Sequence, residues 1–196
     1  MKIFEANIPY TVVNFFKNQA VYKRTLTKLN SELKQISGIN DFFSKTSEIA
    51  ELYEKLNQIQ SIIEEPDRTE YGDFQTNLQL AVKVCRLIEN KEITPEIIIE
   101  PTCGKGNFLL AAIQTFNSIK ELFGIEIHKP YIWQTKFNIL DFYLNNREKS
   151  KPNIQLINAN IFDFNLKKTI KYKHQQITNF GQSALGNKLN VIRFEI

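Results

Sequence analysis

A short apolar run followed at once by a glycine-containing loop is the feature that most constrains the fold of this chain. Residues 97–99 are three consecutive isoleucines flanked by prolines, and the loop after them reads EPTCGKGNF over residues 100–108. A few apolar residues between turn signals are typical of a buried parallel strand. Glycines at positions 104 and 106 allow the backbone to turn sharply and to approach a bound ligand closely. This segment therefore predicts a strand, a ligand-binding loop and a helix in succession.

Strands and helices alternate around this segment. We expect helices at residues 77–90, 108–116 and 131–145, and strands at residues 97–99, 122–127 and 154–157. The first of these helices carries Leu80, Val84, Leu87 and Ile88 on one side. Alternation at these lengths is typical of βαβ units around a parallel sheet, so we predict an α/β fold.

The sequence before Pro66 has a different character, because it is polar and helix-forming. Apolar residues recur at helical spacing from Leu26 to Ile36 and from Ile49 to Ile63, with a break at SGIND, residues 37–41. We predict a helical N-terminal region over residues 1–65, an α/β part over residues 66–166 and a tail over residues 167–196. The helical region is expected to be a packing or partner-facing module. The end of the tail, residues 191–196, alternates like a strand.

Three kinds of glycine loop compete for the segment at residues 100–108. A Walker loop needs Ser or Thr after Gly-Lys, but Gly106 follows Lys105 here. A dinucleotide loop needs a third glycine at position 109, which is Leu109. The third kind is the S-adenosylmethionine loop of adenine-specific DNA methyltransferases, which the segment resembles through an acidic-Pro-x-small-Gly-x-Gly-x-Phe pattern. The matching residues are Glu100, Pro101, Cys103, Gly104, Gly106 and Phe108.

An acidic residue stands where such a loop needs a ribose ligand. Glu126 ends the second expected strand, 22 residues after Gly104 (126 − 104). A carboxylate about 20 residues after the loop can accept hydrogen bonds from both ribose hydroxyls. The alternative is a solvated carboxylate at a strand end. We include Glu126 and its neighbour Ile127 among the predicted cofactor-binding residues.

The resemblance implies further cofactor contacts on either side of the loop. The segment YGDFQT, residues 71–76, resembles the one that contacts the methionine end of the cofactor, through Phe74 and Thr76. Asn77 replaces the usual proline after it and can instead cap the following helix. After the third strand, Asn160 and Ile161 fit the place that meets the adenine ring, with Asp163 as the other candidate.

The family that the chain resembles comprises the adenine N6 methyltransferases of restriction-modification systems, which belong to the class I S-adenosylmethionine-dependent methyltransferases. Members perform catalysis with an Asn/Asp-Pro-Pro-aromatic loop after the fourth strand, where the aromatic residue stacks on a flipped base. The sequence contains no such run. We therefore predict an incomplete Rossmann-like methyltransferase sheet, truncated relative to the family, which binds S-adenosylmethionine but has no catalytic residue of its own. Truncation, internal deletion and frameshift would each produce such a sequence.

Composition bears on the partners, the metal sites and the location that we expect for this chain. The net charge of +4 is compatible with DNA, the partner that the resemblance implies together with a second subunit or the remaining half of the enzyme. A basic cluster at Lys167, Lys168, Lys171 and Lys173 is either a solvated linker or a phosphate contact. With two cysteines and two histidines we expect no metal site. We find neither a secretory signal nor a membrane-length apolar stretch, and expect a cytoplasmic protein.

Overall fold

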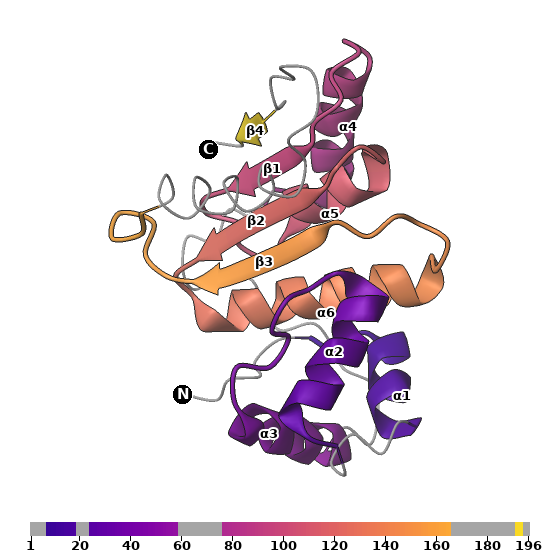
Figure 1. Ribbon diagram of the computed structural model, residues 1–196, viewed down its shortest axis with the longest axis vertical. Coiled ribbons are helices and arrows are strands. Elements are labelled where there is room, and N and C mark those ends of the chain that lie inside the picture. Colours follow the sequence, from indigo (N-terminus) through magenta and orange to yellow (C-terminus); the bar gives the residue numbers. More distant parts are fainter. Residues whose placement is uncertain (1–6, 19–23, 59–75, 166–190, 194–196) are drawn as a thin grey trace, which may run out of the picture.

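A computed structural model of the chain describes residues 7–18, 24–58, 76–165 and 191–193 (Figure 1). The helices in these ranges are α1 (Tyr10–Asn18), α2 (Leu26–Ser37), α3 (Thr46–Gln58), α4 (Leu78–Glu89), α5 (Asn107–Thr115) and α6 (Lys129–Asn145). The strands are β1 (Ile97–Glu100), β2 (Glu121–Glu126), β3 (Asn153–Asn158) and β4 (Val191–Arg193). Each helix and strand expected between residues 77 and 158 is therefore present, with ends that differ by one or two residues.

The four strands form one parallel sheet in the order β3-β2-β1-β4. Parallel neighbours need a crossover connection, and α5 and α6 provide it between β1 and β2 and between β2 and β3. This is the Rossmann-like sheet with flanking helices that the alternating pattern predicted. The strand expected at residues 191–196 is present as β4 beside β1, and residues 194–196 lie outside the described residues.

The register of the sheet divides the strand side chains between two faces, because paired residues in parallel strands face the same side. Ile98, Leu122 and Ile154 are fully buried and share a core with α5 and α6. A smaller cluster on the opposite face consists of Ile97, Ile99 and Phe123. The three isoleucines of β1 are thus buried on both faces, as a central parallel strand requires.

The N-terminal helices share their core with the sheet instead of standing apart from it. α1 and α2 pack against α6, and one continuous cluster of buried side chains runs from Val12 to Ile154 (Figure 1). The predicted break after α2 also extends the sheet, since Ile39 forms a parallel bridge with Ile154. The Asn40 N–H donates to the Ile154 carbonyl, and the Ile154 N–H donates to the Gly38 carbonyl, both at 2.9 Å. The helical region thereby covers the edge of β3.

Helix α4 is present where the sequence places it. The Asn77 side chain accepts a hydrogen bond from the Gln79 N–H at 2.8 Å, so Asn77 caps the helix. Of the apolar residues on one side of the helix, Val84 and Ile88 pack against the core, whereas Leu80 and Leu87 are 54% and 64% exposed. The fully buried residues are the small ones, Ala81 and Cys85. α4 packs against α5, and small side chains allow two helices to approach closely, which the apolar pattern did not reveal.

Candidate cofactor site

The glycine loop joins β1 to α5 through two backbone conformations that favour glycine. Gly104 has φ of 52° and Gly106 has φ of 78°, both in the left-handed region. The Gly106 N–H donates to the Cys103 carbonyl at 2.7 Å, which closes the turn, and the Cys103 N–H donates to the Ile125 carbonyl of β2 at 2.9 Å. The loop therefore begins as an extension of the sheet and ends as the N-terminus of α5.

Glu126 lies beside this loop at the carboxyl end of β2. Its Oε2 accepts a hydrogen bond from the Gly104 N–H at 3.0 Å, and its Oε1 accepts one from the His128 N–H at 2.7 Å. The carboxylate is half-buried and is held by backbone on both oxygens. Each oxygen can accept more than one hydrogen bond, so both can also receive a ligand hydroxyl. This geometry differs from a solvated strand-end carboxylate, whose orientation would not be fixed.

Glu100 is the second acidic side chain of the site, at the end of β1. It is 4% exposed, and it accepts a hydrogen bond from the Leu109 N–H in the first turn of α5. Its Oε2 has no hydrogen-bond partner among the residues that the structure describes. Burial raises the pKa of Glu100 to about 8; the Leu109 hydrogen bond opposes this effect and the nearby Glu126 carboxylate adds to it. The carboxyl group is therefore largely protonated at neutral pH.

The ends of β2 and β3 are tied together at the same edge of the sheet. The Asn158 side chain donates to the carbonyls of Glu126 and Ile127, at 2.9 and 2.8 Å. The Ala159 N–H donates to the Glu126 carbonyl at 3.1 Å. Ile127 is 68% exposed, so its apolar side chain is available to a ligand beside Glu126. The predicted residues of the second and third strands thus come together at the carboxyl edge.

The segment after β3 contains the residues expected to meet the adenine ring. Asn160 uses its Oδ1 to accept the Phe162 N–H at 3.0 Å, and its carbonyl accepts the Asp163 N–H at 3.1 Å, so it organises a turn. Ile161 is half-buried and Asp163 is exposed. Asn160 and Asp163 therefore both remain candidates for the contact with the adenine amino group. The Asn160 Oδ1 already accepts one hydrogen bond.

Thr76, the described residue of the YGDFQT segment, also contacts the loop. The Asn107 side chain at the start of α5 donates to the Thr76 carbonyl at 2.7 Å. Thr76 is thereby placed next to the loop, as the resemblance implied, whereas Phe74 lies outside the described residues. Pro101 is buried directly after Glu100, and Cys103 is buried as well. Burial raises the pKa of the Cys103 thiol, which agrees with a structural role for it.

Two residues that hold the loop were missed by the sequence analysis. The Thr135 hydroxyl donates to the Gly104 carbonyl at 3.1 Å, and the Asn138 side chain donates to the Lys105 carbonyl at 3.2 Å. Both lie on α6, one turn apart. The available signal was a pair of polar residues three positions apart on a helix, and that signal does not identify their partners.

The described residues contain no helix long and apolar enough to cross a bilayer. They also contain no cluster of three or more potential metal-ligating side chains. The absence of a metal site remains a prediction for the whole chain.

The chain is similar in sequence to one known protein and in structure to another. Over 72 residues, the chain is 50% identical to the Type II methyltransferase M.NspV of Nostoc sp. (strain ATCC 29411 / PCC 7524). The aligned stretch covers 37% of this chain and 15% of that protein. A solved modification subunit, assigned to a type I restriction enzyme of Vibrio vulnificus YJ016, matches 64% of this chain and 26% of its own, with 18% identity and a TM-score of 0.38. No family model matches the chain. The sequence match with M.NspV agrees with the resemblance stated above: over 72 residues the chain is similar to a Type II methyltransferase, and it spans a small part of the length of that protein.

Proposed function

We propose that the glycine loop, Glu100 and Glu126 bind S-adenosylmethionine, and that the chain is the cofactor-binding part of a DNA adenine N6-methyltransferase. In this proposal Glu126 accepts hydrogen bonds from the ribose hydroxyls. Ile127 and the turn at Asn160 and Ile161 contact the adenine ring, and Thr76, with Phe74 before it, lies toward the methionine end.

The observation that carries the proposal is the pair of carboxyl groups at the loop. S-adenosylmethionine has a sulfonium, an ammonium and a carboxylate group, so its methionine end carries a net positive charge. Glu100 is buried with an unpartnered oxygen beside the first turn of α5, and Glu126 lies across the loop. A dinucleotide would place an anionic pyrophosphate at the same helix N-terminus. The buried Glu100 carboxyl group at that place favours a cationic ligand, which would stabilise its ionised form, over an anionic one.

The finer assignment to adenine methylation rests on the order of the segments. The YGDFQT segment precedes the glycine loop, as in adenine-modifying enzymes that the chain resembles. The Asn-Pro-Pro-aromatic run that would hold the acceptor base is not among the 196 residues. We therefore propose that methyl transfer to DNA needs a further segment or subunit.

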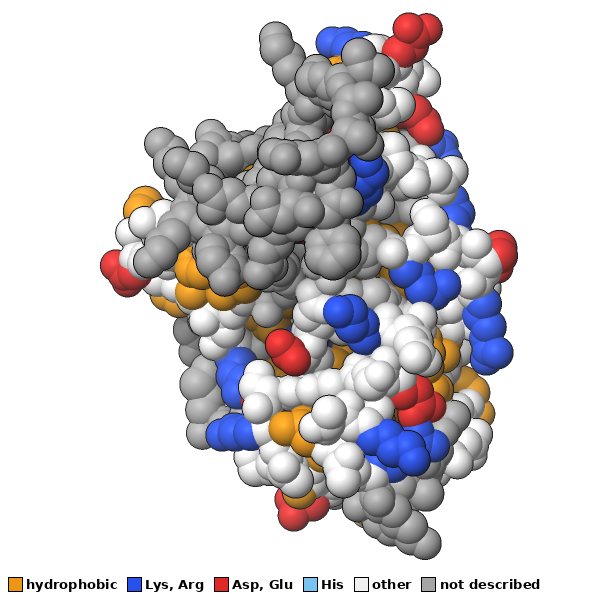
Figure 2. Space-filling view, viewed as in Figure 1, with side chains coloured by type: hydrophobic (Ala, Val, Ile, Leu, Met, Phe, Trp, Pro, Cys, Tyr) orange, Lys and Arg blue, Asp and Glu red, His pale blue; other side chains and the backbone are white. Residues whose placement is uncertain are grey.

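On the face seen in Figure 2, Lys and Arg side chains of the described residues are spread among acidic ones and form no single basic patch.

Calorimetric titration with S-adenosylmethionine and with NAD tests the cofactor assignment. We expect saturable binding of S-adenosylmethionine and none of NAD. Glu126→Gln should weaken the binding about tenfold, because it removes a charged hydrogen-bond acceptor. The matched control is Glu89→Gln, at the exposed end of α4, which should leave the affinity unchanged. Binding of NAD alone would refute the cofactor assignment, and methyl transfer to DNA by this chain alone would refute the requirement for a further segment.

A further inference from the structure

Helix α6 has two contact surfaces that the proposed cofactor contacts do not use. One surface meets the glycine loop, and the other meets the helical region formed by α1, α2, α3 and the segments between them. Because a helix is a rigid rod, its attachment on one side fixes the position of groups on the other.

On the loop side, α6 determines where the loop carbonyls point. The Thr135 side chain is fully buried and donates to the Gly104 carbonyl at 3.1 Å. A Cβ at Gly106 would overlap the Thr135 side chain, so loop and helix are in close contact. Asn138 holds the next carbonyl, that of Lys105, at 3.2 Å.

These bonds have a consequence for the loop amides. The C=O and N–H of one trans peptide point in opposite directions. Holding the Gly104 carbonyl toward Thr135 therefore turns the Lys105 N–H away from α6. The same constraint fixes the backbone on which the Gly104 N–H meets the Glu126 carboxylate. Thr135 and Asn138 thus determine the loop shape that a ligand at Glu126 would meet.

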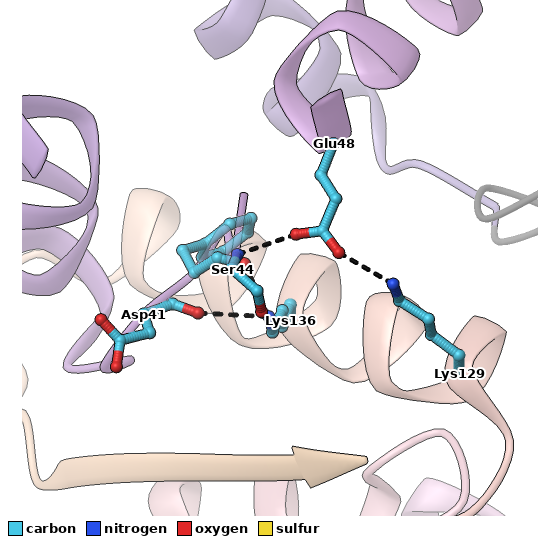
Figure 3. A network of polar contacts seen from close by, with 6 residues as sticks. Asp41, Ser44, Glu48, Lys129 and Lys136 are labelled. Carbon is cyan, nitrogen blue, oxygen red and sulfur yellow. Dashed lines mark hydrogen bonds and ion pairs between the residues drawn. The ribbon is translucent and has the colours of Figure 1, made fainter. Parts of the chain in front are cut away.

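On the opposite side, α6 is attached to the helical region by two lysines (Figure 3). Lys129 forms an ion pair with Glu48 at 2.8 Å, and Glu48 also accepts the Ser44 N–H at 2.8 Å. Lys136 donates to the carbonyls of Phe42, at 2.6 Å, and of Asp41, at 3.4 Å. Glu48 is 1% exposed and Lys136 is 5% exposed, so each contact has a buried charged group, although the Lys129 side chain is 38% exposed.

The pKa values of Glu48 and Lys136 indicate that these contacts offset part of the cost of burying the two charged groups. Burial by itself raises the pKa of Glu48, yet the hydrogen bonds from Lys129 and Ser44 leave that pKa below its ordinary value. Burial lowers the pKa of Lys136 to about 8, with Glu48 opposing the decrease. An uncompensated charge at either place would be costly, so the contacts hold α6 firmly against the helical region.

We propose that Thr135 and Asn138 are positioning residues of the cofactor loop, and that the helical region supports the cofactor site through α6. The inference rests on the proposed function for the ligand, but the loop geometry itself can be tested without any ligand. It gives the helical region a role in the site, beyond the packing or partner-facing role expected from its sequence.

Two substitutions at one position separate the hydroxyl from the methyl group. Thr135→Val keeps the shape but removes the donor to Gly104, whereas Thr135→Ser keeps the donor. In the ligand-free chain we expect Thr135→Val to speed hydrogen exchange of the Gly104 and Gly106 amides about fivefold or more, because one hydrogen bond is lost. Thr135→Ser should leave the exchange rates of both amides near those of the wild type. Affinity for S-adenosylmethionine should fall by a similar factor in Thr135→Val alone. Thr115→Val, at the end of α5, is the control.

The helical region is tested by Lys129→Met, which removes the partner of buried Glu48. It should also speed exchange of the Gly104 and Gly106 amides, whereas Lys149→Met, at the other end of the domain near Gln114, should not. If both Thr135→Val and Lys129→Met keep the wild-type rates of amide hydrogen exchange and the wild-type affinity for S-adenosylmethionine, the inference is overturned. If the wild-type chain does not bind S-adenosylmethionine, the proposed function fails, while the exchange measurements still decide the inference.

Discussion

Glu100 combines properties that are costly in a carboxyl group. It is buried, it keeps one oxygen without a partner, and its pKa is raised to about 8. Groups perturbed in this way are often found at functional sites, where the cost is retained because a ligand later satisfies the group. A cationic ligand would stabilise the ionised form of Glu100 and so lower its pKa again.

Glu100→Gln should therefore stabilise the free chain and weaken its ligand binding. The folded-state pKa of Glu100, about 8, lies above its ordinary value of 4.5, so the folded protein binds the extra proton between these pH values. Its contribution to stability is present below pH 4.5 and is lost as the pH rises toward 8. Relative to wild type, Glu100→Gln should gain on the order of 3 kcal/mol in stability between pH 5 and pH 8.

Thermal unfolding at both pH values measures this gain, and titration with S-adenosylmethionine measures the affinity. Wild-type affinity should rise as the pH increases through 8, and the variant should lack that rise. Identical pH profiles of stability and of affinity for the two proteins would show that Glu100 has no part in either effect.

Individual site residues differ in how far the sequence could reveal them. Glu126 was predictable because its distance from the glycine loop along the chain reflects one strand-helix-strand unit. The raised pKa of Glu100 was not, because it depends on burial and on the distance to Glu126 in the folded chain. Thr135 was also hidden, since its partner Gly104 lies 31 residues away along the chain.

At the scale of elements, the contact between the loop and α6 explains why glycine stands at position 106. A side chain there would adopt a strained positive φ and would also overlap the Thr135 side chain. The strand opposite offers a similar case, because Gly124 of β2 leaves room for Leu109. Leu109 stands where a dinucleotide loop has its third glycine. It nevertheless packs closely against the sheet, because the strand opposite it has a glycine at position 124.

Gly106→Ala should destabilise the chain by about 2 kcal/mol, the sum of backbone strain and crowding. Combining it with Thr135→Ser removes the methyl group nearest to the new Cβ. The double variant should therefore recover part of the lost stability. Chemical denaturation of the two single variants and the double variant gives the coupling free energy. Strictly additive losses would mean that the contact with Thr135 contributes nothing to the requirement for glycine.

The helices and strands themselves were predicted well, because apolar periodicity and turn residues act over a few positions. The packing of α4 shows the limit of this approach. Periodicity finds an apolar stripe that includes Leu80 and Leu87, but these two side chains are exposed, and the fully buried residues of α4, which packs against α5, are Ala81 and Cys85. The choice between two adjacent stripes depends on the partner helix, which the local sequence does not specify.

At the scale of the whole molecule, the helical region and the sheet share one hydrophobic core. The bridge between Ile39 and Ile154 covers the edge of β3, and aromatic rings of both parts meet where Phe42 and Phe43 pack against Trp133. The sequence indicated helices before Pro66 but not this contact, because the residues involved are about 90 to 115 positions apart. Distant pairings of this kind depend on the folded topology and leave no local pattern.

Binding of S-adenosylmethionine at the carboxyl edge of the sheet can be measured by mapping backbone amide resonances during a titration with this cofactor. We predict saturable shifts that are largest at Gly104, Gly106, Ile127, His128 and Asn160, with smaller changes along α6 and little change on the outer side of α3. An absence of saturable shifts at millimolar cofactor, or saturable shifts confined to residues away from this edge, would contradict the claim.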